Sequence, residues 1–293
     1  MADTSRPNAA MGRLRKPLHF SLSADRGWRQ RFQLAATDLE DGARLWRLVW
    51  ALALADIKLR YRGSALGPFW LTISSGVQIG AMAFVYAGLF RVDIRQYLPF
   101  LAVSIILWNF LSSLITEGCT CFSQSDALIK GARMPFTVHA ARSVVRNTIV
   151  LAHNIVVVVA VLVIMDVDGS FYSLAVIPAF CLWVIDAFAI SLLLGAFCAR
   201  FRDVPQIVAS MMQVAFFVTP VMWSTSILEN HSRAELLIRY NPFFYMLEIL
   251  RAPLLGTPVT ADVALRALFI SAAILIVSWI GFARARGRVA YWV

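Results

Sequence analysis

The sequence predicts an all-α integral membrane protein with six transmembrane helices, and three observations lead to this fold class. Hydrophobic residues make up 59% of the chain and charged residues only 15%, whereas soluble domains average about 45–50% and about 25%. Six apolar runs can each cross about 30 Å of hydrocarbon at 1.5 Å per residue. Basic residues gather in alternate connections, which is the positive-inside pattern of a membrane protein. The runs are about 69–90, 97–115, 147–165, 173–199, 205–224 and 263–283.

Residues 1–42, before the first apolar run, are polar and rich in arginine. They contain no apolar core of the kind that a secretory signal needs. We therefore expect a basic N-terminal tail on the cytoplasmic side, partly disordered and close to anionic lipid.

Residues 43–66 predict an amphipathic interface helix followed by a sharp turn. At about 100° per residue, a basic arc faces an apolar arc, although Asp56 and Arg60 interrupt the apolar side. Such a helix is typical of one that lies in a membrane surface. Gly63 and Gly67 allow the turn, and Pro68 suits the first turn of the next helix. The basic arc comprises Arg44, Arg47, Lys58 and Arg62.

The membrane domain, 67–293, has two connections longer than a turn requires. The inner one contains a short run of helix-forming residues, 125–135, bounded by Gly131 and Pro135, which predicts a helix parallel to the membrane. The outer one begins with Asn241 and Pro242, a helix cap followed by a first-turn proline. The apolar helix that follows is too short to span, so we expect a re-entrant periplasmic gate helix. The charge pattern places both termini in the cytoplasm.

Sequence motifs for chemistry are absent. The chain has no glycine-rich nucleotide loop ending in Lys-Ser or Lys-Thr and no His-Glu-x-x-His. Cys119-x-Cys121 has no partner pair, so no metal site is expected. The net charge of +10 follows the connections rather than one face, which argues against nucleic-acid binding. The chain is therefore expected not to be an enzyme and to hold no cofactor.

Several segments resemble the permease subunits of bacterial polysaccharide exporters, which are ABC transporters of the ABC-2 type that move O-antigen, capsule or teichoic acid chains. Residues 60–70 (RYRGSALGPFW) are similar to the start of the first membrane helix of that family. Residues 200–206 and 217–221 resemble the surroundings of its fifth helix, and residues 241–256 resemble its outer gate helix.

The resemblance implies a transport subunit that works as a homodimer in the bacterial inner membrane. It also implies two separate ATP-binding cassette subunits, which would carry ATP and Mg, and a lipid-linked polysaccharide as substrate. The short inner helix, 125–135, would bind the ATPase subunit. Apolar side chains would lie at the centre of this contact, and polar side chains would surround them. The residues expected to contact the ATPase are Asp126, Leu128, Ile129, Lys130, Gly131 and Arg133.

Aromatic residues in the membrane runs suit a sugar polymer, because C–H faces of sugar rings stack on aromatic rings. The alternative is lipid-facing rings and interfacial belts. The expected pathway residues are Trp70, Phe84, Tyr86, Phe216, Phe217, Trp223, Phe243, Phe244 and Tyr245.

Three polar residues are expected inside the membrane, where an acid is costly unless it is paired or neutral. Asp186 on the fourth run lies at a similar depth to His153 and its neighbour Asn154 on the third, which predicts a pair between them. The alternative is a protonated Asp186 that faces a seam between helices.

Other functions remain open. The chain could be an ABC-2 exporter of a small drug or lipid, which a small-molecule response of the ATPase would reveal. It could instead be a membrane-embedded enzyme that acts on lipid-linked sugar, although no acid–base motif supports this. A structural scaffold without transport would function without any ATPase partner.

Overall fold

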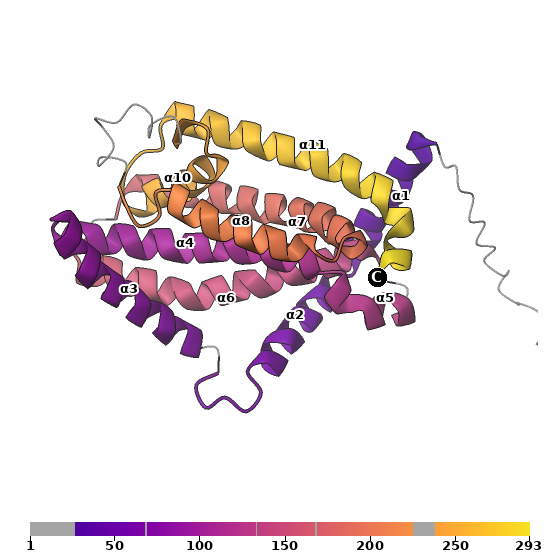
Figure 1. Cartoon of the computed structure of the whole chain (residues 1–293), viewed down its shortest axis with the longest axis horizontal. Coiled ribbons are helices and arrows are strands. Elements are labelled where there is room, and N and C mark those ends of the chain that lie inside the picture. The colour runs from indigo at the N-terminus through magenta and orange to yellow at the C-terminus, as the bar shows by residue number, and fades with distance from the viewer. Residues whose placement is uncertain (1–26, 68, 133, 168, 225–237) are drawn as a thin grey trace, which may run out of the picture.

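The computed structural model describes residues 27–67, 69–132, 134–167, 169–224 and 238–293, which include helices and no strands. Pro68, Arg133 and most of the predicted tail lie outside the described residues. The elements in chain order are α1 (Trp28–Arg44), α2 (Trp46–Arg60), α3 (Phe69–Phe90), α4 (Ile94–Thr120), η1 (Ser123–Ser125), α5 (Asp126–Ala132), α6 (Phe136–Ile164), η2 (Phe171–Ala175), α7 (Val176–Arg200), α8 (Val204–Val218), α10 (Pro242–Leu254) and α11 (Ala261–Trp292) (Figure 1).

Five of the described helices are long and apolar enough to cross a membrane, namely α3, α4, α6, α7 with η2, and α11. The sixth predicted span, α8, has 15 residues, which is about 22 Å of helix. It ends because Pro220 follows Thr219, and a residue before proline is disfavoured in the helical region. Thr219 accordingly has an extended conformation, with φ −85° and ψ 139°. The fold is all-helical and multi-pass, and the crossing by α8 stays a prediction.

Helix α4 forms the centre of the bundle. It contacts α3, α6, α7, α8 and α10, and most of its length is buried. It packs tightly against α7 at Gly118 and Gly195. A Cβ on Gly195 would lie 3.2 Å from the carbonyl oxygen of Gly118 and 2.6 Å from the sulfur of Cys121. Glycine is therefore required at this crossing for the two backbones to pack.

Helix α1 occupies part of the region predicted as a tail. The prediction of a tail up to residue 42 was wrong from Trp28 onward, because α1 packs on α6 and α11. Asp38 is buried and holds the contact: its carboxylate accepts the backbone N–H of Thr137 at 3.0 Å and Nε of Arg286 at 2.8 Å. The Thr137 hydroxyl donates to the carbonyl oxygen of Asp38 at 2.7 Å.

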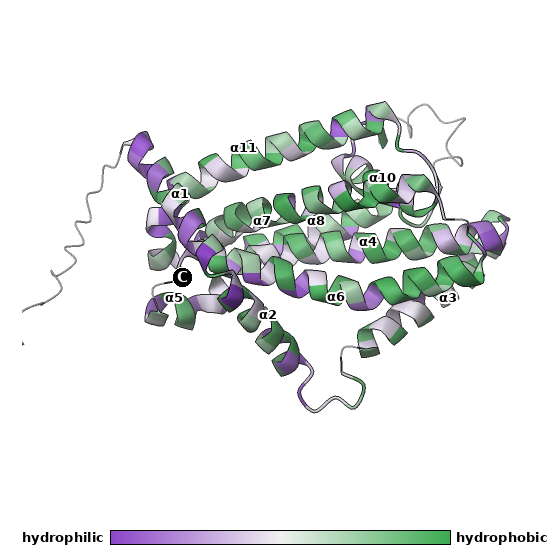
Figure 2. Cartoon of the chain, turned by 180° about the vertical axis from the view of Figure 1, so that it is seen from behind, coloured by the Kyte–Doolittle hydropathy of each residue, from purple (hydrophilic) through white to green (hydrophobic). Residues whose placement is uncertain are grey.

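The two ends of the bundle carry different elements. Helices α1, α2 and α5 and the C-terminus lie near one end, and the α3–α4 and α6–α7 connections and α10 lie near the other (Figure 1). Between them the long helices are mainly hydrophobic, as Figure 2 shows, while α1 is largely hydrophilic. We refer to the end with α1, α2 and α5 as the basal end and to the other as the α10 end.

Candidate functional site

Helix α2 lies across the basal end with one face against α6. Val49, Ala53 and Ile57 are buried on that face. The four cations of the predicted basic arc are all exposed, as are the indole rings of Trp46 and Trp50. Exposed tryptophans beside exposed cations suit a membrane surface, so the interface helix remains our interpretation of α2.

An ion-pair network joins α2, α4 and α6 at the basal end. Arg142 donates to both oxygens of Asp56, with Nε at 2.7 Å from Oδ2. Arg146 reaches Asp56 with Nη1 at 3.0 Å and Glu117 with Nη2 at 2.7 Å. Arg60 reaches the other oxygen of Glu117 at 3.2 Å. Three elements that are distant in sequence are therefore tied by charge-assisted hydrogen bonds, which are stronger than neutral ones.

The electrostatic state of Asp56 follows from these contacts. Burial alone would raise the pKa of its carboxyl, but the hydrogen bond and charge of Arg142 and the charge of Arg146 outweigh burial. The pKa of Asp56 is therefore lower than its ordinary value, and the carboxylate is ionised near neutrality. Asp56 and Arg60 had interrupted the apolar side of the predicted helix. That irregularity was the sequence signal for this network.

Helix α5 is the short inner helix that the sequence predicted, and the structure shows which of its residues are accessible. Ile129 is buried in the chain's own core, whereas Leu128 is only half-buried. Lys130 pairs with Asp126 at 2.7 Å and donates to the carbonyl oxygen of Val293 at 3.0 Å.

The predicted end of α5 was slightly wrong. Gly131 lies inside the helix, which continues to Ala132, because Gly131 does not adopt a positive φ. Arg133 lies outside the described residues. Of the two predicted apolar anchors, Leu128 is therefore the more accessible, since Ile129 already packs inside the chain.

Helix α10 begins as predicted. The side chain of Asn241 accepts the backbone N–H of Phe243 at 3.0 Å, and Pro242 occupies the first turn. Asn241 also donates to the hydroxyl of Thr219 at 2.9 Å. These contacts fix the N-terminus of α10 to the turn that follows α8.

Arg251 anchors the other half of α10 in the bundle, a role that the sequence did not reveal. It is 3% exposed. Its guanidinium donates to Glu248 on the same helix, to the hydroxyl of Ser104 at 3.1 Å and to the carbonyl oxygen of Pro220 at 2.6 Å. It also lies 4.7 Å from the centre of the Phe100 ring, a cation–π contact. The helix is thereby tied to α4 and to the turn after α8.

The predicted aromatic pathway residues are spread over three environments. Their rings form three groups: Tyr86 contacts Phe90 on α3, Trp108 on α4 contacts both Phe216 and Phe243, and Phe244 contacts Tyr245 on α10. Trp108 was missed because nothing in a continuously apolar run distinguishes it. Exposed rings are Trp70, Phe84 and Phe217; half-buried rings are Tyr86, Phe216, Trp223, Phe243 and Phe244; the ring of Tyr245 is buried.

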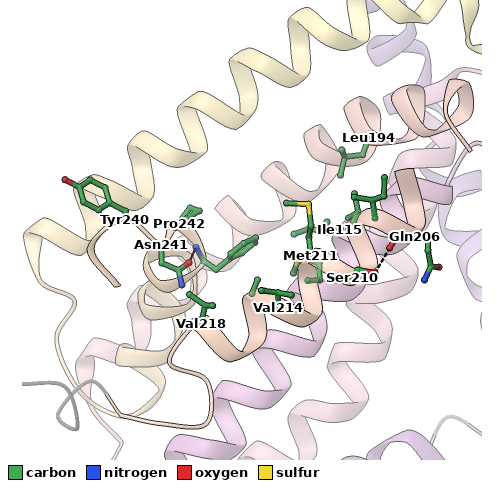
Figure 3. A pocket seen from close by; sticks show the side chains of 15 residues that line it. Ile115, Leu194, Gln206, Ser210, Met211, Val214, Val218, Tyr240, Asn241 and Pro242 are labelled. Atoms are coloured by element: carbon green, nitrogen blue, oxygen red, sulfur yellow. Dashed lines mark hydrogen bonds between the residues drawn. The ribbon is translucent and has the colours of Figure 1, made fainter. Parts of the chain in front are cut away.

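A groove of about 1040 Å³ runs along α8 from Gln206 to the start of α10 (Figure 3). Its walls are almost entirely apolar, with Met211, Val214 and Val218 along α8 and Ile115 contributed by α4. Of the nine predicted pathway residues, Phe243 alone lines this groove. Such a surface can hold acyl chains or another helix.

The predicted pair between Asp186 and the third apolar run was wrong. Asp186 accepts a hydrogen bond from the hydroxyl of Ser271 on α11. His153 bonds the carbonyl oxygen of Ile149 within its own helix, and the side-chain oxygen of Asn154 has no protein partner among the described residues. Similar depth did not predict contact, because α11 packs along α7 and supplies a nearer hydroxyl.

Comparisons with known proteins agree with this architecture. Residues 47–255 match the family model described as ABC-2 type transporter. The chain is 28% identical over 202 residues to the O-antigen export system permease protein RfbA of Myxococcus xanthus, covering 67% of this chain and 75% of that protein. Two proteins of the same name from Klebsiella pneumoniae are 24% identical over 204 residues, with 69% of this chain and 78% of each covered.

Proposed function

The chain belongs to the ABC-2 type transporter family, and we propose that it is the permease subunit of an ATP-driven exporter of a lipid-linked polysaccharide. The observation that carries the proposal is the similarity to three relatives named as O-antigen export permeases, each matched over at least three quarters of its length. Family membership makes the chain a transport subunit of the membrane rather than an enzyme. The alternative of a membrane enzyme acting on lipid-linked sugar has no comparable support.

A homodimer in the bacterial inner membrane is part of the same proposal. The interior around α4 is filled by side chains such as Leu101, Ile105 and Trp183. A polymer path between two copies is therefore favoured over a path through one chain. The groove along α8 offers an apolar surface on which another element of the assembly could pack.

The positive-inside rule supports a cytoplasmic location for the basal end. Arg142 and Arg146 lie there, and Arg200 and Arg284 join it through ring contacts with Trp292 and Trp28. The α10 end carries Asp93, Asp166, Glu248 and Asp262 as well as the cations Arg91, Arg95, Arg239, Arg251 and Arg266, of which Arg251 and Arg266 pair with Glu248 and Asp262. In this orientation α5 faces the cytoplasm, where an ATPase subunit binds, and α10 is the periplasmic gate.

The defining experiment reconstitutes the purified permease with its ATP-binding cassette partner in proteoliposomes. We expect ATP hydrolysis to rise when lipid-linked glycan is added, with protected glycan appearing on the far side. A rise with small drugs and none with glycan would favour the small-molecule exporter. Glycan chemistry without any ATPase subunit would favour the enzyme.

The aromatic pathway is tested by Phe244→Ala and Trp70→Ala. Because stacked rings guide a sliding polymer, either change should alter export rate or chain-length tolerance while the complex still assembles. Tyr291→Ala is the matched control, since this ring is 90% exposed and outside the predicted set. Wild-type export by both variants would contradict the assignment.

A further inference from the structure

A second, polar cavity lies at the basal end, away from the apolar groove. Its volume is about 200 Å³, and residues of α2, the α4–α5 connection and the first turns of α6 line it. A single water needs roughly 10–15 Å³ of such space, so the cavity can hold a larger polar group. Gln124, an exposed residue, is part of the lining and marks where the cavity reaches the surface.

Four polar atoms in this lining have no protein partner among the described residues. They are both ring nitrogens of His139, the hydroxyl of Ser143 and Nη1 of Arg142. His139 is 1% exposed and Ser143 is 3% exposed. Buried polar groups of native proteins are nearly always hydrogen-bonded, so side chains this deeply buried point to a guest that satisfies them.

The lining offers several unpartnered donors and only one anionic acceptor. Asp56 is its one carboxylate, and both of its oxygens already accept hydrogen bonds from Arg142 and Arg146. Burial raises the pKa of the Cys121 thiol, so this group adds no negative charge. A guanidinium N–H, a hydroxyl and an imidazole in one small cavity are the donors that bind a compact oxyanion.

The charged side chains around the cavity carry a net positive charge, which an anion can neutralise. Within the network, Arg60, Arg142 and Arg146 face Asp56 and Glu117, which gives one uncompensated positive charge. Pairing this charge with an anion would lower the cost of burying it.

We propose that this cavity, which we call the His139 cavity, binds a phosphate group. Nη1 of Arg142 and the Ser143 hydroxyl hold the phosphate oxygens, and His139 donates a further hydrogen bond. The phosphate can belong to an anionic lipid headgroup or to a free phosphate compound, because the cavity is lined by α2, which we interpret as an interface helix, and by the exposed residue Gln124. Figure 1 shows α2 and the neighbouring α5 near the same end of the bundle. This site is independent of the exported polymer.

The test measures binding of inorganic phosphate to the full-length protein in an uncharged detergent, by calorimetry at constant ionic strength. We expect saturable binding that Ser143→Ala and His139→Leu weaken by roughly tenfold or more, the scale of one lost charge-assisted hydrogen bond. Ser278→Ala is the matched control, because its buried hydroxyl also has no partner within the described part of the chain but lies on α11. It should bind phosphate as the wild type does.

A second arm separates the two sources of phosphate. The protein is placed in nanodiscs of phosphatidylcholine with and without phosphatidic acid, and phosphate binding is measured again. Competition by phosphatidic acid would assign the site to a lipid headgroup, and unchanged binding would assign it to a free phosphate compound. Absence of saturable binding, or equal binding by wild type, Ser143→Ala and His139→Leu, would overturn the proposal and leave a hydrated cavity only.

Discussion

Replacing Asp56 by asparagine should detach α2 from α6. The carboxylate accepts three hydrogen bonds from two guanidinium groups, and its side chain is 14% exposed. Asparagine keeps the shape but loses the charge and one acceptor oxygen. Arg146 keeps its bonds to Glu117, so the loss falls mainly on Arg142, which remains half-buried and without an anionic partner.

The expected cost lies between two reference cases. Exposed ion pairs contribute about 0–1 kcal/mol, and breaking a fully buried pair costs about 3–5 kcal/mol. For a carboxylate this deeply buried with two cationic partners, we expect Asp56→Asn to lower the free energy of unfolding by about 2–4 kcal/mol.

The contribution of Asp56 also has a definite pH dependence. Its folded pKa is depressed below the unfolded value of about 3.9. The stabilisation is therefore complete above about pH 4 and is lost as the pH falls through the folded pKa. The difference between wild type and Asp56→Asn should be constant between about pH 5 and pH 8 and should shrink below pH 4.

The assay combines unfolding in a denaturing detergent with hydrogen exchange of α2. Amides of α2 should exchange faster in Asp56→Asn, while those of α4 keep their protection. Lys58→Gln is the control on the same helix, since Lys58 is exposed and its replacement should change stability by less than about 0.5 kcal/mol. A double-mutant cycle with Arg142→Met should show coupling of at least about 1 kcal/mol. Additive effects, or unchanged protection of α2, would refute the reasoning.

The remaining predictions concern backbone approach, a turn and the inner helix. Gly195→Ala should lower the free energy of unfolding by about 1–3 kcal/mol, because the added methyl group overpacks the α4–α7 crossing. Gly80→Ala is the control: an added Cβ meets nothing within 4 Å there, so thermal unfolding should show no loss of stability. Asp166→Gly should raise stability by about 1 kcal/mol, because Asp166 has a φ of 56° just after α6; no gain in thermal unfolding would contradict this. Leu128→Asp should abolish co-purification of the ATPase subunit from an inserted, dimeric permease; retained coupling would remove α5 from the mechanism.

The elements that sequence predicted well depend on local signals. Helix α3 begins at Phe69 and ends at Phe90, as its apolar run predicted. Gly63 and Gly67 both adopt positive φ at the predicted turn, since only glycine does so at little cost. Asn241 caps α10 through its own side chain. Each of these features needs only the residues within one or two turns.

The features that sequence reasoning missed depend on contacts between distant segments. Asp38 reaches Arg286, which is 248 positions away, and no local pattern connects them. Arg251 lies within the predicted gate helix, where the sequence assigned it no role, yet it is buried among groups from three segments. An isolated polar residue on an apolar face indicates that a partner exists, as Asp186 does, but the packing of helices decides which residue it is.

The region outside the family match is joined to the inner helix through one apolar cluster. Residues 47–255 match the family, so Asp38 and Arg286, which pair with each other, both lie beyond it. Ala35 of α1 and Phe282 of α11 pack in the same buried cluster as Phe122 and Ile129, which hold α5. A force on α5 must therefore act on the ends of α1 and α11 as well as on α4, because packed interiors have few voids and transmit strain. The position of α5, the proposed contact with the ATPase subunit, thus depends on residues outside the family match.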